Sequence, residues 1–215
     1  MGYLEHKEHF NIAYKTGADT WTHPSATTEG RMFIEKLTLG ANILDVGSGR
    51  GFFAKHLADL GFKVIGIDFA KEAVEKANEN VVDWGLEGKL KFVEADTLEI
   101  PFVDASFDAV CDFGLFETLY TEDWPKYINE ISRVLKPGGL YLNVSLSRET
   151  HHFFEFTPKA GVDVDFEKYG IHYHFFGEDE MKTIFLNKLE VISQKTEFAK
   201  IDGKIILLET LFKKK

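Results

Sequence analysis

The sequence predicts an α/β domain built on a doubly wound, mainly parallel β-sheet, and three observations support this. Short apolar runs alternate with helical patterns between residues 41 and 146, and strands separated by helices pair in parallel through right-handed crossovers. A glycine-rich turn follows the first apolar run directly, as it does where such a sheet forms a ligand pocket. Near the C-terminus, Asp202-Gly203 separates two strand-like runs, which favours a tight antiparallel hairpin.

The individual elements follow from the spacing of apolar residues. After the glycine turn, Phe53, Leu57 and Leu60 share one helix face, and Gly61 ends this helix. Lys136-Pro137-Gly138-Gly139 is expected to form the turn that ends a later helix. Strands are predicted at residues 42–46, 63–67, 89–94, 107–112, 140–146, 190–198 and 204–212, and helices at residues 52–60, 71–84, 124–135 and 178–185.

We expect one domain, residues 1–215, in which four segments have different roles. Residues 1–40 are polar and aromatic and are expected to form an N-terminal cap or arm. Residues 41–146 form the ligand-binding core. Residues 147–176 are rich in histidine and aromatic side chains and are expected to form a substrate lid. Residues 177–215 supply a C-terminal helix and the β-hairpin.

The composition narrows the range of functions. A formal net charge of −10 disfavours a polyanion as ligand, so no nucleic-acid partner is expected. The single cysteine, Cys111, lies in an apolar strand and permits no internal disulfide, which fits a reducing, cytoplasmic compartment. No apolar run approaches the roughly 20 residues of a membrane span, so no membrane partner is expected.

The spacing of the glycine turn distinguishes between cofactors. The turn is Gly47-Ser48-Gly49-Arg50-Gly51, and Asp45 stands two residues before its first glycine. A dinucleotide fingerprint needs Gly or Ala where this chain has Phe52, because helix and strand pack closely at that position. No Gly-Lys-Ser/Thr follows, which excludes a P-loop. The carboxylate of Asp45 would repel a pyrophosphate and favours a cofactor with a cationic ammonium or sulfonium group.

Acidic residues recur at the ends of the first three predicted strands. Asp68 lies about 20 residues after the glycines, where a carboxylate accepts hydrogen bonds from ribose hydroxyls. Asp96 and Thr97 follow the third strand and can meet the edge of an adenine. Because the carboxyl ends of parallel strands share one edge of the sheet, Asp45, Asp68 and Asp96 are expected to face a single crevice.

In these features the chain resembles the class I S-adenosylmethionine-dependent methyltransferases of the small-molecule type. The resemblance rests on residues 43–51, 64–68, 94–102, 106–110 and 133–139, in this order and spacing. It implies a Rossmann-like, doubly wound seven-stranded sheet of order 3-2-1-4-5-7-6 with strand 7 antiparallel. It also implies S-adenosyl-L-methionine as the cofactor and S-adenosyl-L-homocysteine as its product.

The resemblance implies a role for each of the site residues. The backbone around the glycine turn approaches the methionine part of the cofactor, and Asp45 helps to position its amino group. Asp68 binds the ribose, Phe69 packs on the adenine, and two polar residues recognise the adenine edge. Two residues after the fourth strand lie close to the sulfonium, and an N-terminal aromatic residue covers the cofactor. The full expected set is Asp45, Gly47, Ser48, Gly49, Gly51, Asp68, Phe69, Asp96, Thr97, Asp112, Phe113 and Tyr14.

Methyl transfer from a sulfonium is an in-line displacement that depends mainly on alignment. A base is needed only when the acceptor holds a proton. The catalytic residue therefore stays unassigned, with Glu117, His151 and His152 as candidates. Many relatives have a histidine near position 117, and Glu117 departs from that pattern. Glu117 is a candidate base or a group that attracts a cationic acceptor, and an ordinary helix-start carboxylate is the favoured alternative. No metal site is expected. His172 and His174 are the pair that could bind a metal, and a surface or lid role is favoured for them.

The acceptor class is the open question. A small-molecule acceptor is the leading hypothesis; a cofactor-binding protein without turnover and a methyltransferase of macromolecules are the alternatives. The turn Asp112-Phe113-Gly114 lacks the prolines typical of enzymes that methylate amino groups of nucleic acids. Phe52 and Asp45 make a nicotinamide oxidoreductase less favoured. The sequence leaves the oligomeric state open.

Overall fold

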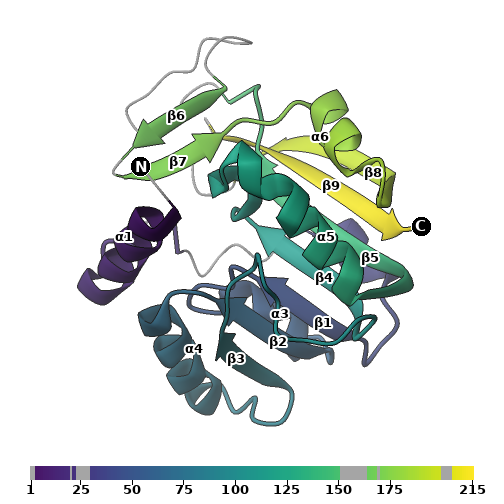
Figure 1. The fold of residues 1–215 in the computed structure, drawn as a ribbon. Helices are drawn as coiled ribbons and strands as arrows, with labels where there is room; N and C mark the ends of the chain where they lie inside the picture. Colours follow the sequence, from purple (N-terminus) through teal and green to yellow (C-terminus); the bar gives the residue numbers. More distant parts are fainter. Residues whose placement is uncertain (1–2, 20, 23–29, 151–163, 169, 200–204) are drawn as a thin grey trace.

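A seven-stranded sheet forms the centre of the protein (Figure 1) and has the order β3-β2-β1-β4-β5-β9-β8. The computed structural model describes residues 3–19, 21–22, 30–150, 164–168, 170–199 and 205–215. The strands of this sheet are β1 Asn42–Val46, β2 Lys63–Asp68, β3 Leu90–Glu94, β4 Phe107–Phe113, β5 Leu135–Leu146, β8 Leu189–Phe198 and β9 Ile206–Lys214. β1 to β5 pair in parallel, whereas β9 pairs antiparallel with both β5 and β8. When the seven strands of this sheet are numbered along the chain, their order is the predicted 3-2-1-4-5-7-6. The last of them along the chain, β9, is antiparallel, which confirms the prediction for strand 7.

Helices cover both faces of the sheet, so the predicted doubly wound architecture is also confirmed. On one face, α2, α3 and α4 pack on side chains such as Ile43 and Phe92. On the other, α5 and α6 pack on side chains such as Val110 and Tyr141. The helices are α1 Tyr3–Thr16, α2 Arg31–Lys36, α3 Phe52–Asp59, α4 Lys71–Asp83, α5 Trp124–Val134 and α6 Glu178–Phe185, with short 3-10 turns η1 Phe116–Thr118 and η2 Thr121–Asp123.

The structure differs from the expected elements in three places. The cap segment contains the helix α1, and the lid segment contains a small antiparallel sheet of β6 Asp165–Lys168 and β7 Ile171–His174. α5 ends at Val134, and β5 begins directly at Leu135, so the turn expected at residues 136–139 belongs to the strand. A register shift opposite β4 accommodates these residues. The hairpin turn at Asp202-Gly203 lies outside the described residues.

Close packing forces glycine at two positions of the turn after β1. Gly47 and Gly51 have φ values of 70° and 83°, which L-residues with a side chain rarely adopt. A Cβ on Gly47 would lie 2.4 Å from Leu115 Cδ1, and one on Gly51 would lie 2.2 Å from Phe92 Cζ. The turn is therefore held between Leu115, in the segment after β4, and the Phe92 side chain of β3.

We expect Gly51→Ala to lower the free energy of unfolding by about 3 kcal/mol. Part of this loss comes from the positive φ, and the larger part from overpacking against the buried Phe92 ring. Gly85→Ala is the matched control, because Gly85 has φ +65° and a Cβ there would meet no atom within 4 Å. Urea denaturation measures both variants; equal losses in the two would contradict the packing argument.

Candidate active site

The glycine turn lies at the carboxyl edge of the sheet and borders a small cavity. The cavity has a volume of about 80 Å³ and is lined by Tyr14, Trp21, Thr22, Asp45, Gly47, Ser48, Gly49, Arg50, Gly51, Phe52, Phe53 and Phe113. Several of the residues expected at the site from the sequence therefore share one wall: Tyr14, Asp45, the three glycines and Phe113, with Ser48 between the glycines.

Asp45 projects from β1 into this wall and is almost fully buried. Burial raises the pKa of its carboxyl to about 7; the Cys111 thiol opposes the rise, and the nearby Asp112 and Asp68 add to it. Cys111 Sγ lies 3.5 Å from Asp45 Oδ1, on the neighbouring strand β4. An uncompensated carboxyl at this position favours a cation in the cavity.

Asp68 ends β2 and ties the glycine turn to the sheet. Its Oδ2 accepts the backbone N–H of Gly49 at 2.9 Å, and its Oδ1 accepts that of Ala70 at 2.8 Å. Burial raises the pKa of Asp68 to about 6, although both hydrogen bonds favour the carboxylate. Each carboxylate oxygen has a second lone pair, so the group can accept further donors from a ligand.

Asp96 and Thr97 follow β3 on the same edge. Asp96 Oδ1 accepts the N–H of Leu98 at 2.9 Å, and its Oδ2 lies 2.9 Å from Lys7 Nζ of α1. The hydroxyl of Thr97 is buried and has no hydrogen-bond partner among the residues that the structure describes. A buried hydroxyl without a partner is costly, so this position is suited to a polar ligand atom.

The helix α1 lies across the edge formed by these strand ends. Besides the Lys7–Asp96 pair, its Phe10 packs edge-to-face on Phe69 with ring centroids 5.7 Å apart. One turn further along α1, the Tyr14 hydroxyl lies 2.8 Å from where a Cβ on Gly49 would stand. α1 thus covers the positions expected for both the adenine and the methionine part of a cofactor.

An ion pair fastens the segment after α1 to the glycine turn. Arg50 contacts Asp19 through two hydrogen bonds of 2.6 Å and 2.8 Å, and it also donates to the Tyr14 carbonyl. The Asp19 side chain is only 5% exposed, so water screens this pair weakly. Trp21 Nε1 donates to the Tyr14 hydroxyl at 3.0 Å, which orders the cover further.

Asp112 occupies a different place from its neighbour Phe113. Phe113 lines the cavity, whereas the Asp112 side chain lies on the opposite face of the sheet, fully buried. Its carboxylate accepts hydrogen bonds from Tyr127 Oη at 2.6 Å, from the N–H groups of Leu115 and Phe116, and at 3.3 Å from Tyr141 and Asn143. Burial raises its pKa to about 6. In this arrangement Asp112 fixes the segment after β4.

Glu117 lies in η1 beneath the β6–β7 hairpin and is 7% exposed. Its Oε2 accepts the backbone N–H of Leu146, at the end of β5. Burial raises the pKa of Glu117 to about 8, opposed by that hydrogen bond and reinforced by Asp112. Tyr173 of β7 is close enough that the Glu117 charge contributes to raising its pKa.

The described part of residues 147–176 packs as an extension of the core. Phe175 and Phe176 are fully buried, and Phe176 stacks on Phe116 at 5.1 Å. His172 and His174 share one face of β7, and both approach Asp165, at 3.6 Å and 2.7 Å. His151 and His152, two candidate catalytic residues, lie outside the described residues.

A second polar group lies where α1, the segment after β4 and β7 meet. His6 and His172 flank the Tyr120 ring, with centroids 5.8 Å and 4.9 Å from it. The Nε2 atoms of both histidines are buried and form no hydrogen bond with the described residues, although His172 Nε2 lies 3.6 Å from Asp165 Oδ1. Burial, together with His172 and His9, lowers the pKa of His6 to about 4, so its ring is neutral at physiological pH.

The contacts that α1 makes were not predictable from the sequence. Lys7 and Phe10 approach the crevice although neither was expected there, and Arg50 was considered only as part of the turn. The spacing of His6, Phe10, Ala13 and Tyr14 is the sequence signal that marks one face of this helix. What this face packs against is not encoded in that spacing.

Two further features of the described residues bear on the chemistry. Within them, no group of three His, Cys, Asp or Glu side chains is arranged to hold a metal ion. No helix in the same part of the chain is long and apolar enough to cross a bilayer.

Comparison with known families agrees with this geometry. Residues 44–143 match a family model described as a methyltransferase domain. This stretch contains the glycine turn, the three acidic strand ends and Glu117. The match covers 100 of the chain's 215 residues, and the observed strand order is the one that the resemblance to class I S-adenosylmethionine-dependent methyltransferases implies.

Individual relatives cover different parts of the chain. The sterol 4-C-methyltransferase of Caenorhabditis elegans is 36% identical over 110 residues, which are 50% of this chain and 32% of that protein. The ubiquinone/menaquinone biosynthesis C-methyltransferase of Pseudomonas fluorescens is 31% identical over 145 residues, 60% of this chain and 56% of that protein. The chain thus spans from about a third to just over half of their lengths.

A solved structure shows the same fold over nearly the whole chain. The 1,6-didemethyltoxoflavin-N1-methyltransferase of Burkholderia thailandensis superposes with a TM-score of 0.80 and covers 98% of this chain and 88% of its own. Its sequence identity is 18%, so the likeness is one of fold.

The buried carboxyls predict how stability depends on pH. Asp45, Asp68, Asp112 and Glu117 keep protons in the folded state that the unfolded chain releases above about pH 4. The free energy of unfolding should therefore fall between pH 4 and 8, by at least about 2 kcal/mol from pH 5 to pH 8. Urea denaturation at a series of pH values measures this.

One variant tests how much of this decrease in the free energy of unfolding comes from Glu117. Glu117→Gln cannot ionise, so the decrease between pH 6 and 8 should become smaller. Glu99→Gln, a change at an exposed position, is the control and should leave the profile unaltered. A profile that rises toward pH 8 in the wild-type protein would refute the assignment.

Proposed function

We propose that this protein transfers a methyl group from S-adenosyl-L-methionine to a small-molecule acceptor. The observation that carries the proposal is the convergence of Asp45, Asp68 and Asp96 with the glycine turn on one edge of the sheet. A sulfonium cofactor with an ammonium group, a ribose and an adenine has complementary groups in the same order. The Burkholderia enzyme, which shares the fold, was solved with S-adenosylhomocysteine and 1,6-didemethyltoxoflavin bound.

The residues present fit that cofactor. The glycine turn and Asp45 would hold the methionine part, Asp68 the ribose, and Asp96 with Thr97 the adenine edge beside Phe69. The buried Thr97 hydroxyl without a partner supports this placement. When bound, the cofactor supplies a methyl group already activated by its sulfonium. The protein's part is to align the acceptor and to keep water out.

The cover over the crevice must move for the cofactor to enter. A cavity of about 80 Å³ is well below the roughly 300 Å³ at which small-molecule pockets begin. α1 holds Asp96 through Lys7, and Arg50 holds Asp19. We infer that these two ion pairs open for binding, and that the adenine replaces Lys7 at Asp96.

Glu117 is the candidate for proton handling at the acceptor. With a pKa of about 8, its carboxyl holds a proton at neutral pH and donates a hydrogen bond. Above that pH it becomes a carboxylate able to accept a proton from an acceptor hydroxyl, thiol or amine. The Nε2 atoms of His6 and His172, which form no hydrogen bond to the described residues, offer two more polar contacts near β7.

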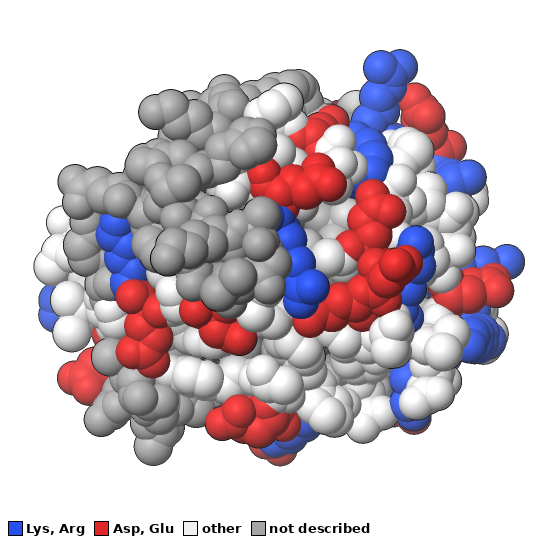
Figure 2. Space-filling view, turned by 90° about the horizontal axis from the view of Figure 1, so that it is seen from above, with Lys and Arg blue, Asp and Glu red and all other residues white. Residues whose placement is uncertain are grey.

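The relatives and the surface support a neutral or cationic small acceptor. The names of the Caenorhabditis and Pseudomonas relatives concern sterols and quinones. Acidic side chains form continuous areas on the face shown in Figure 2, with basic ones between them.

A macromolecular acceptor and a binding role without turnover are the alternatives. Incubation with labelled cofactor and panels of thiol, hydroxyl and amine acceptors tests them; no transfer to any small acceptor would contradict the proposal. A cytoplasmic location stays a prediction.

Ligand titration by thermal shift tests the cofactor itself. S-adenosylhomocysteine should raise the melting temperature, and NAD should not, since Phe52 and Asp45 oppose a dinucleotide. Asp68→Asn should weaken S-adenosylhomocysteine at least about tenfold, because a charged acceptor of ribose hydroxyls becomes a neutral amide. The exposed Asp83→Asn is the control and should bind as the wild type does. Stabilisation by NAD alone would overturn the proposal.

The Arg50–Asp19 pair should limit the rate at which the cover, α1 and the segment after it, opens. Asp19→Asn removes a weakly screened ion pair, so S-adenosylhomocysteine should dissociate several-fold faster. Stopped-flow fluorescence of Trp21, which contacts the cover residue Tyr14, follows the release. Glu35→Gln breaks the exposed Arg31–Glu35 pair, with side chains 82% and 60% exposed, and should leave the rate unchanged. An unchanged rate in Asp19→Asn would show that this pair does not hold the cover.

A further inference from the structure

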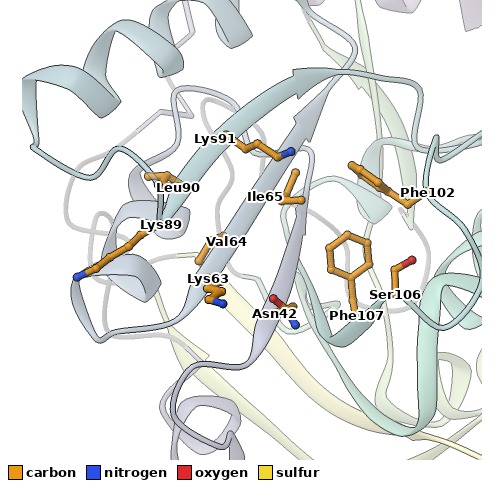
Figure 3. Close-up of a pocket in the computed structure, with 11 residues that line it drawn as sticks. Asn42, Lys63, Val64, Ile65, Lys89, Leu90, Lys91, Phe102, Ser106 and Phe107 are labelled. Carbon is orange, nitrogen blue, oxygen red and sulfur yellow. The ribbon is translucent and has the colours of Figure 1, made fainter.

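A larger cavity lies at the opposite edge of the sheet, where the parallel strands begin. It has a volume of about 560 Å³ and is lined by Asn42, Lys63, Val64, Ile65, Gly88, Lys89, Leu90, Lys91, Phe102, Ser106 and Phe107 (Figure 3). β2 carries Lys63 at this edge and Asp68 at the other, at the two ends of a six-residue strand, which places them about 17 Å apart. The cavity is therefore separate from the crevice proposed for the cofactor.

The cavity exists because no helix covers this part of the sheet. The connection from β3 to β4, residues 95–106, is fully described and contains no helix. Its Leu98 and Ile100 fill the core near the carboxyl edge, but at the amino edge only Phe102 reaches the sheet. Ile65 of β2 consequently stays partly exposed on a sheet face that is elsewhere buried.

Three lysines stand at this edge of the apolar surface. Lys63 and Lys91 stand on the same sheet face as Ile65, and β2–β3 register places Lys91 beside Ile65 and Lys89 next to Lys63. In Figure 3 the Lys91 side chain extends over Ile65 toward Phe102, whereas the Lys89 side chain points away from the other labelled residues. Like charges side by side on neighbouring strands are destabilising.

Among the described residues, no carboxylate forms an ion pair with Lys63, Lys89 or Lys91, although the chain has 35 acidic and 25 basic residues. Asp108, which follows the lining residue Phe107, is already engaged by Lys136 at 2.6 Å and by the Asn42 N–H at 2.9 Å. In an acidic protein, a group of cations without acidic partners favours an external anion.

The walls of the cavity suit an aromatic ligand body. Phe102 and Phe107 meet edge-to-face with centroids 5.2 Å apart, and Phe102 is partly exposed. Ile65 and Phe102 pack against the cluster that contains Phe107, and all three side chains line the cavity together with the lysines. A volume of about 560 Å³ falls within the range of pockets that bind drug-sized molecules, about 300–1,000 Å³.

We propose that this cavity is a second ligand site, which binds a small organic anion with an aromatic body. The ligand's rings lie against Ile65, Phe102 and Phe107, and its anionic group faces Lys63 and Lys91. The site does not depend on the proposed methyl transfer, because it shares no residue with the cofactor crevice.

Fluorescence titration with 8-anilinonaphthalene-1-sulfonate tests the proposal. This dye combines an aromatic body with one sulfonate, and N-phenyl-1-naphthylamine is its uncharged counterpart. We expect one dye per protein, affinity at least about tenfold higher for the sulfonate, and weakening with added salt. Saturating S-adenosylhomocysteine should leave dye binding unchanged. Absent binding, equal affinity for the two dyes or displacement by S-adenosylhomocysteine would overturn the proposal.

Two double variants, one of them a control, test where the dye binds. Lys63→Glu with Lys91→Glu should lower the affinity at least about tenfold, while its melting temperature should not fall below that of the wild type, since repulsion is relieved. Lys71→Glu with Lys76→Glu makes the same change in net charge on α4, where both lysines already pair with glutamates. This control should retain dye binding. Equal losses in both double variants would show that the dye responds to net charge alone, and the proposal would fail.

Discussion

The carboxylate of Asp68 connects the sheet to the turn that forms the crevice. One oxygen accepts the Gly49 N–H and the other the Ala70 N–H, so the end of β2, the glycine turn and the start of α4 are fixed together. The other features of the site depend on this link. The turn can lie against Leu115 and Phe92 only because glycines stand where a side chain would collide, and Asp45 faces the cavity only because the turn leaves β1 in this direction.

The acidic edge of the sheet also explains why α1 rests on it. Lys7 pairs with Asp96, and Arg50 pairs with Asp19 in the segment after α1. Buried carboxyls at this edge have raised pKa values and favour any cation that reaches them. In the proposed function, the cover and the cofactor compete for the same carboxylate at Asp96. Binding then couples to the position of α1, which carries His6 toward the junction with β7.

The two edges of the sheet have opposite character. Carboxylates gather where the parallel strands end, and lysines gather where β2 and β3 begin. The first arrangement, the carboxylates at the strand ends, is the one expected from the resemblance to the methyltransferase family. The second follows from the connection between β3 and β4, which leaves an apolar face bare. A net charge of −10 conceals this polarity, because a sum over the chain carries no information about position.

The sequence alone determined the alternation of strands and helices and the residues of the glycine turn, because periodicity and glycine spacing are local properties. The order of the strands was predicted through the resemblance to a known family. The sequence also indicated the acidic strand ends that meet at one edge. Only the tertiary structure decided that Asp112 is a buried hydrogen-bond hub while Phe113 lines the cavity, and that Lys7 and Phe10 cover the crevice. The lysine-lined cavity was equally hidden. These features join residues from distant parts of the chain, and no local pattern specifies which surfaces meet when the core packs.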